Sequence, residues 1–258
     1  MSEDSSRTQS GGIDNARAAL ADQGYLLTND QLIGLPRNFR QTFLDAYFND
    51  GVLRHDDGDW PADRKRARDV VRYRWRDGGL DLQEHDTIII TDRADIAGKR
   101  EHKRVSLLDD PRAEEMVRTF LSLIPLGRRQ ADGTFDVNLF RTFTNVVTKP
   151  HRDDEEFVII YVLDRMGGGA ASYLYEADGD FIDGRPTAEP VLRHQLNPGD
   201  ILIFDDERFI HDASELKPLP GGTAQRDVLV CTVDYRDTYL AEKQPPADES
   251  VLAGSDVR

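Results

Sequence analysis

FDVNLFRTFTNVV, residues 135–147, is the first of a series of strand-like runs that fill the C-terminal half of this chain. The runs are rich in β-branched and aromatic residues, which are typical of strands. The later runs are EEFVIIYVL (155–163), ASYLYEA (171–177), PVLRHQL (190–196), DILIF (200–204), RFIHDAS (208–214) and RDVLVCTVDY (226–235). Turn signals such as GGG at 167–169 and NPGD at 197–200 separate them. Short strands at such intervals predict an all-β sandwich or barrel.

The N-terminal half has a mixed pattern. Apolar residues at helical spacing predict helices over 13–23 and 37–49, and Pro111 at a first helical position predicts another over 110–124. Strands are expected at 70–75 and 87–91, with a loop over 50–66 between the second helix and the first of these strands.

The domain boundaries follow from composition. Residues 1–12 are rich in Ser and Gly, and residues 241–258 combine a Pro pair with acidic residues, so both ends are expected to be mobile tails. A single domain is expected over 13–240, with its helical and mixed part (13–134) packed against a β-barrel core (135–240).

Charge and composition exclude several classes of protein. The chain of 258 residues has a formal net charge of −15, the wrong sign for general nucleic-acid binding. It has no apolar run long enough to span a membrane and no signal-peptide pattern, so we expect a cytoplasmic protein without a membrane partner. The single cysteine, Cys231, is expected to be a buried strand thiol.

Two of the six histidines occur in a His-x-Asp pattern, about the number that chance would give. His55 lies in a polar loop, whereas His151 and Asp153 lead directly into the strand EEFVIIYVL. In an extended segment residues i and i+2 project to the same side, so these two side chains can converge on one metal ion. His211 could return to the same end of a barrel and complete a set of two imidazoles and one carboxylate. Such a set binds Fe(II) in non-haem oxygenases, although Zn, Mn or Ni would also fit.

Arg226 begins the last long strand, where a buried charge must find a partner. A dicarboxylate co-substrate would supply the anion. A structural ion pair with Asp205 or Asp206 is an equal alternative at this stage.

The order of these motifs resembles that of the Fe(II)/2-oxoglutarate-dependent dioxygenases, whose core is a double-stranded β-helix (a jelly-roll or cupin-like fold). HRDDEEFVIIYVLDRMGGG (151–169), LRHQLNPGDILIFDDERFIHDASEL (192–216) and QRDVLVCTVDY (225–235) resemble the bacterial free-amino-acid hydroxylases such as isoleucine 4-hydroxylase. The resemblance, which covers roughly residues 66–236, implies that His151, Asp153 and His211 bind Fe(II). It also implies that Arg226 binds the distal carboxylate of 2-oxoglutarate.

The remaining site residues are assigned by strand position. Many relatives carry Ser or Thr two residues after the arginine, but this chain has Val228, so Tyr161 is a candidate second 2-oxoglutarate contact. A core tyrosine is the simpler interpretation of Tyr161. Arg141 is the first candidate for a substrate carboxylate, although an ion-paired strand arginine is the commoner case. Phe157 and Ile159 would form an apolar wall near the metal. We expect His55, His85, His102 and His194 to be structural.

The resulting expectation is a mainly β enzyme with flanking helices that hydroxylates an unactivated C–H bond of a small molecule, most simply a free L-amino acid. Fe(II), 2-oxoglutarate and O2 would be its cofactors, succinate and CO2 its by-products, and ascorbate a useful reductant in vitro. A carrier-bound amino acid, a peptide or a natural-product intermediate is the alternative substrate. A halogenase is disfavoured because Asp153 fills the position that a halide needs. A catalytically silent binding module is the non-enzyme alternative. Oligomeric state is left open by the sequence.

Overall fold

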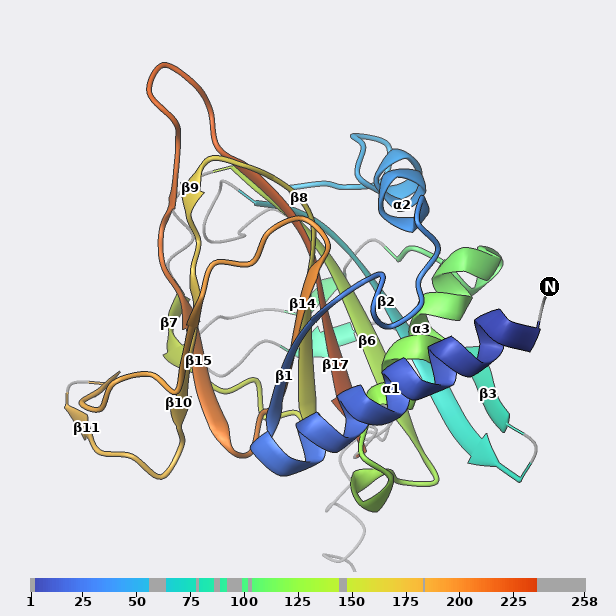
Figure 1. Ribbon diagram of the computed structural model, residues 1–258. Helices are drawn as coiled ribbons and strands as arrows, with labels where there is room; N and C mark the ends of the chain where they lie inside the picture. The colour runs from blue at the N-terminus through green and yellow to red at the C-terminus, as the bar shows by residue number, and fades with distance from the viewer. Residues whose placement is uncertain are drawn as a thin grey trace, which may run out of the picture.

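The computed structural model describes residues 3–55, 64–77, 79–85, 89–91, 99–101, 104–143, 148–182 and 184–235. Two antiparallel sheets face each other, and the helices lie against the outer face of the larger sheet (Figure 1). Strands far outnumber helices in this part of the chain. The expected mainly β fold with a double-stranded β-helix core is confirmed.

The two sheets are built from strands distant in sequence. The larger sheet contains, in spatial order, β1 (Tyr25–Asn29), β14 (Asp200–Asp205), β8 (Phe157–Met166), β17 (Gln225–Asp234), β6 (Asp132–Thr142), β2 (Arg64–Arg76) and β3 (Gly79–Glu84). The smaller sheet contains β13 (Leu192–His194), β10 (Ser172–Glu176), β15 (Phe209–Ala213) and β7 (Thr148–His151). Short pairs add β4 (Ile89–Thr91) with β5 (Lys99–Glu101), β11 (Phe181–Ile182) with β12 (Arg185–Pro186), and β9 (Gly168–Gly169) with β16 (Leu216–Lys217).

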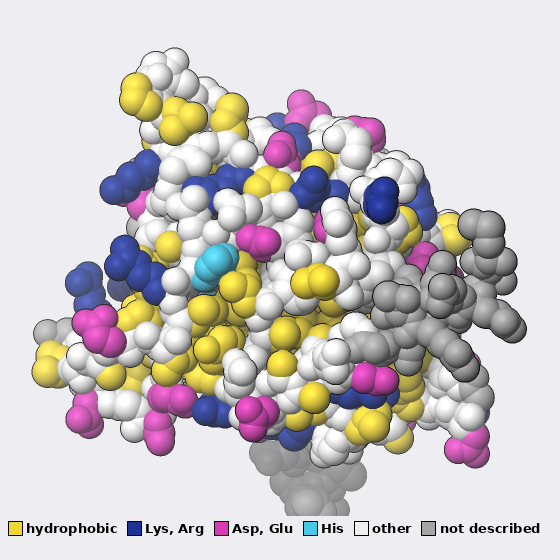
Figure 2. Space-filling view, in the orientation of Figure 1, with side chains coloured by type: hydrophobic (Ala, Val, Ile, Leu, Met, Phe, Trp, Pro, Cys, Tyr) yellow, Lys and Arg dark blue, Asp and Glu magenta, His cyan; other side chains and the backbone are white. Residues whose placement is uncertain are grey.

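The larger sheet is buried on both faces, which explains the nearly continuous apolar run of β8. Successive side chains of a strand point to opposite faces. Phe157, Ile159 and Tyr161 belong to the core that includes residues of the helices, whereas Val158 and Val162 belong to the core that includes residues of the smaller sheet. In Figure 2, hydrophobic side chains are visible in the space between the two sheets, with charged side chains around them.

Three helices cover the outer face: α1 (Glu3–Gln23), α2 (Phe39–Tyr47) and α3 (Pro111–Leu123). Two single 3₁₀ turns flank α3, at Leu107–Asp109 and Leu126–Arg128. Helix α3 starts where the sequence predicts, because the Asp110 side chain accepts a hydrogen bond from the Arg112 backbone N–H and Pro111 occupies the first turn. Its buried residues, among them Met116, Val117 and Phe120, lie in the core between sheet and helices.

Some boundaries differ from the sequence expectation. The backbone of α1 is helical from Glu3, so residues expected as an N-terminal tail belong to a helix. Strand β2 begins at Arg64, earlier than residue 70, because its pairing with β6 starts there and continues to Arg74. The expected C-terminal tail (241–258) and much of the 50–66 loop lie outside the described residues. None of the helices in the described ranges is long and apolar enough to cross a membrane.

Candidate active site

His151 and His211, far apart in sequence, meet because β7 and β15 are neighbouring antiparallel strands. The two residues are direct partners in the register of this pair. Directly opposed side chains lie close together in an antiparallel pair. Their imidazole rings have centroids 4.2 Å apart.

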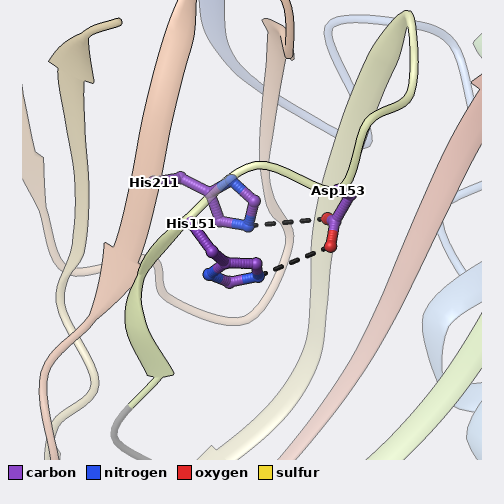
Figure 3. Close-up of side chains that lie close together, drawn as sticks. All are labelled: His151, Asp153 and His211. Atoms are coloured by element: carbon purple, nitrogen blue, oxygen red, sulfur yellow. Dashed lines mark ion pairs between the residues drawn. The ribbon is translucent and has the colours of Figure 1, made fainter. Parts of the chain in front are cut away.

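Asp153 approaches both histidines from the turn that follows β7. The carboxylate Oδ1 lies 3.4 Å from His151 Nε2, and Oδ2 lies 3.6 Å from His211 Nε2 (Figure 3). One ligand atom from each residue lies within 4.8 Å of the other two. Asp154, the next residue, has φ 63°, a left-handed conformation that turns the chain sharply between the two sheets. The three side chains that the sequence predicts as one metal site therefore converge.

The orientation of His151 leaves Nε2 available for a metal ion. Its Nδ1 lies 2.9 Å from the backbone carbonyl of Lys149. A carbonyl oxygen only accepts, so Nδ1 is the donor and carries the ring proton in the neutral imidazole. Nε2 then keeps its lone pair, which is directed towards Asp153. Two imidazoles and a carboxylate are a donor set that suits Fe(II).

The triad lies at a cavity of about 220 Å³ between the two sheets. Arg226, at the start of β17, lines the same cavity. Its Nε and Nη2 atoms are buried, and no residue in the described ranges accepts a hydrogen bond from either. Burial, and secondarily the positive charges of Arg165 and Arg64, lower the pKa of Arg226 to about 10.

These observations fit a dicarboxylate co-substrate. An unpaired buried guanidinium is costly, and a carboxylate that forms two parallel hydrogen bonds removes that cost. The alternative of a structural pair with Asp205 or Asp206 does not hold, because Asp205 accepts from Arg128 and Asp206 accepts from the backbone N–H of Glu155.

The expected positions of Tyr161, Phe157 and Ile159 are wrong. All three lie in the core on the helix side of the larger sheet, and the hydroxyl of Tyr161 donates to Asp30 at 3.1 Å. The alternation of side chains does not continue from His151 to β8, because β7 and β8 belong to different sheets and a turn separates them. The residue of β8 that lines the cavity is Ile160.

Arg141, the expected substrate contact, does not line the cavity of the triad. Its Nε and Nη2 donate to the two carboxylate oxygens of Asp227 at 2.8 and 2.7 Å. Its neighbours on β6, Phe140 and Thr142, line the cavity, so Arg141 faces the opposite side of the sheet. The commoner case, an ion-paired strand arginine, applies here.

Arg64 and Thr142 are cavity residues that the sequence does not indicate. Thr142 pairs with Arg64 on one side and with Arg226 on the other, in the register of β2, β6 and β17. All three line the cavity, and the Arg64 guanidinium lies 4.6 Å from the centre of the Phe140 ring. The Arg-rich start of β2 is visible in sequence, but the register that brings Arg64 next to Thr142 is not.

The other described histidines lie outside the triad. His55 Nδ1 contacts the carbonyl of Arg64, His85 Nε2 lies 3.2 Å from Arg72, and His194 Nε2 lies 3.8 Å from Asp200. His102 is outside the described residues. Cys231 is free and buried, as expected.

A double-stranded β-helix with two histidines and one aspartate at its inner cavity is the architecture of a non-haem metal oxygenase. A model of the family described as 2OG-Fe dioxygenase matches residues 38–232. The chain belongs to this family and is an oxygenase whose cofactors are Fe(II), 2-oxoglutarate and O2. A search of curated proteins found no match.

Solved structures share the fold. A bsmA homolog from Methylobium petroleophilum PM1 has a TM-score of 0.67 at 21% identity, over 86% of this chain and 93% of that one. IDO from Bacillus thuringiensis has a TM-score of 0.63 at 16% identity, over 87% of this chain and 99% of that one. The Fe(II)/α-ketoglutarate-dependent dioxygenase TqaL has a TM-score of 0.66 at 12% identity, over 88% of this chain and 89% of that one.

Proposed function

We propose that this dioxygenase hydroxylates an unactivated C–H bond of a free L-amino acid or a close derivative. The observation that carries the proposal is a single small cavity that contains the His-Asp-His triad and two arginines, Arg226 and Arg64. Its volume of about 220 Å³ is below the roughly 300–1,000 Å³ of sites for drug-sized ligands. A co-substrate and a small substrate suit such a space better than a long peptide does.

The residues have separate roles in this proposal. His151, Asp153 and His211 hold Fe(II), and Arg226 binds the distal carboxylate of 2-oxoglutarate. Thr142, the cross-strand partner of Arg226, offers the hydroxyl contact that Val228 lacks. When bound, Fe(II) and 2-oxoglutarate supply the oxidative chemistry, in which O2 is consumed, succinate and CO2 are released and one oxygen atom enters the substrate.

The rest of the cavity excludes water and orients the substrate. Ile160, Val228 and Val230 form an apolar wall from β8 and β17. An apolar wall lowers the local dielectric and strengthens the ionic contacts of the cavity. An amino acid with an apolar side chain would place that side chain against this wall.

Arg64 is the proposed partner of the substrate carboxylate. It lies two strands from Arg226 on the same face of the sheet, a separation of roughly 10 Å between strand axes. This separation lets two anions occupy the cavity together without sharing one guanidinium. Arg64 therefore takes the role that the sequence assigned to Arg141.

A turnover screen tests the proposed substrate class. The protein would be incubated with Fe(II), 2-oxoglutarate, ascorbate and each proteinogenic amino acid, and succinate and a product one oxygen atom heavier would be measured. We expect coupled hydroxylation of at least one apolar amino acid. Coupled turnover only of a carrier-bound, peptide or natural-product substrate would establish the alternative substrate class. A protein that never consumes 2-oxoglutarate would be a silent binding module.

Replacing Arg64 with Gln tests the substrate contact. We expect the KM for the amino acid to rise about 10- to 100-fold, because a charge-assisted hydrogen-bonded pair contributes about 1.5–3 kcal/mol. The slow uncoupled decay of 2-oxoglutarate should remain. Arg141→Gln is the matched control, since it removes the same charge from the opposite face and should leave that KM unchanged. Equal KM effects of both variants would contradict the assignment.

A further inference from the structure

Asp206 is a completely buried carboxylate between β14 and β15, outside the set of proposed metal ligands. Its Oδ2 accepts a hydrogen bond from the Glu155 backbone N–H at 3.1 Å, and its own backbone N–H donates to the Glu156 carbonyl at 3.2 Å. Glu155 and Glu156 belong to the turn that carries Asp153. Asp206 thus fixes this turn to the β14–β15 connection, three residues before the start of the strand that carries His211.

The second oxygen of Asp206 faces His211. Asp206 Oδ1 and His211 Nδ1 are 3.7 Å apart. Both atoms are buried, and neither has a hydrogen-bond partner within the described ranges. A shift of less than about 1 Å would bring them to hydrogen-bond distance. The Phe204 ring, centred 5.0 Å from the imidazole, packs against His211 and restricts its other movements.

A carboxylate at this place determines which imidazole nitrogen carries the proton. A carboxylate oxygen accepts, so Asp206 Oδ1 favours His211 with the proton on Nδ1. Nε2, which points at Asp153, then keeps its lone pair. In His151 the backbone carbonyl of Lys149 likewise accepts from Nδ1 and leaves the lone pair on Nε2. Partners of this kind orient metal-bound histidines and raise their basicity.

We propose that Asp206 is a positioning residue of the metal centre, which aligns His211 and holds the Asp153 turn in place at the same time. This inference rests on the proposed metal ligands. Asn at position 206 cannot replace Asp, because both contacts need an acceptor and Asn has only one acceptor oxygen. If its NH2 group faces His211, it donates to Nδ1 and moves the ring proton to Nε2, where it blocks metal binding.

The test is the Fe(II) affinity of Asp206→Asn under anaerobic conditions, measured by direct titration and by the charge-transfer absorption with 2-oxoglutarate. We expect the Kd for Fe(II) to rise about 10- to 100-fold. Asp205→Asn is the control, because Asp205 is also buried and hydrogen-bonded, to Arg128, but does not contact His211. It should leave the Kd for Fe(II) unchanged even if it lowers the melting temperature.

A measurement on the wild-type protein covers the case in which Asp206→Asn does not fold. In protein labelled with ¹⁵N-histidine and loaded with Zn²⁺ as a diamagnetic substitute, His211 should carry its proton on Nδ1 and bind the metal through Nε2. The opposite pattern, or wild-type Fe(II) affinity in folded Asp206→Asn, would overturn the inference while the metal site stands. Equal losses in both Asn variants would also overturn it. A wild-type protein that binds no Fe(II) would instead refute the proposed function.

Discussion

At the scale of single residues, Arg226 lines the cavity of the triad with two buried donor atoms, Nε and Nη2, that lack an acceptor among the described residues. Burial lowers the pKa of Arg226 to about 10. Its guanidinium is therefore charged at neutral pH. An anion with two oxygens would pair with both atoms.

Replacing Arg226 with Gln should raise the concentration of 2-oxoglutarate needed for half-saturation about 10- to 100-fold, since a bidentate charged pair contributes about 1.5–3 kcal/mol. The measurement is a 2-oxoglutarate titration of the Fe(II)-loaded protein, followed by visible charge-transfer absorption. Fe(II) affinity without 2-oxoglutarate is the internal control and should not change. An unaltered 2-oxoglutarate affinity would show that Arg226 has a structural role.

At the scale of elements, the turn between β7 and β8 carries an unusual carboxyl group. Burial, together with the negative charges of Asp136, Asp234 and Asp153, raises the pKa of Glu155 to about 9. Its Oε2 is buried without a hydrogen-bond partner among the described residues. In the unfolded chain a glutamate titrates near its ordinary pKa of about 4.3. The folded protein therefore keeps a proton that the unfolded chain has lost.

The sign of the pH dependence follows from this difference in bound protons. Below about pH 4 Glu155 is protonated in both the folded and the unfolded chain, so its titration does not change the free energy of unfolding. As pH rises from there towards 9, only the unfolded chain loses the proton, and the free energy of unfolding falls. Glu155→Gln should remove this fall and stabilise the metal-free protein by about 1–3 kcal/mol at pH 8. Urea unfolding of both proteins with a chelator, at pH 4.5 and at pH 8, measures this difference in the free energy of unfolding. Equal stability of variant and wild type at pH 8 would contradict the protonated state.

At the scale of the whole molecule, the site joins the two sheets. His151 and His211 belong to the smaller sheet and Arg226 to the larger one, so their common ligands would link the two. A ligand that binds only the folded state stabilises it by about 2.7 kcal/mol at one hundred times its Kd.

Zn²⁺ together with 2-oxoglutarate should therefore raise the melting temperature of the wild-type protein by about 5–10 °C, given roughly 2–4 °C per kcal/mol for a domain of this size. Zn²⁺ avoids oxidation during heating. His151→Ala and His211→Ala should lose most of this increase, and Arg226→Gln should lose only the part due to 2-oxoglutarate. An increase that persists in both His variants would place the metal elsewhere.

The sequence alone indicates the strands of the core, the start of α3 and the three residues that converge as the triad. These features depend on local chemistry: β-branched runs, an N-cap with Pro111, and ligand residues fixed next to strands. His151 ends a strand, Asp153 follows it in the turn, and Arg226 stands near the start of a strand. His211 lies in the middle of β15, and the sequence indicates it by its resemblance to the dioxygenase motif. The convergence of the first three is confirmed by the geometry.

Only the tertiary structure decides which face of each strand meets the cavity. Alternation from His151 predicts that Phe157, Ile159 and Tyr161 face the metal, but the chain changes sheets at Asp154 and the alternation restarts. Arg141 and Arg64 cannot be distinguished in sequence, because both are strand arginines. The register of β2, β6 and β17 turns Arg64 towards the cavity of the triad and Arg141 towards Asp227. This register is set by pairing between strands that are distant in sequence. The residues around Arg64 or Arg141 therefore do not indicate which face of the sheet each side chain occupies.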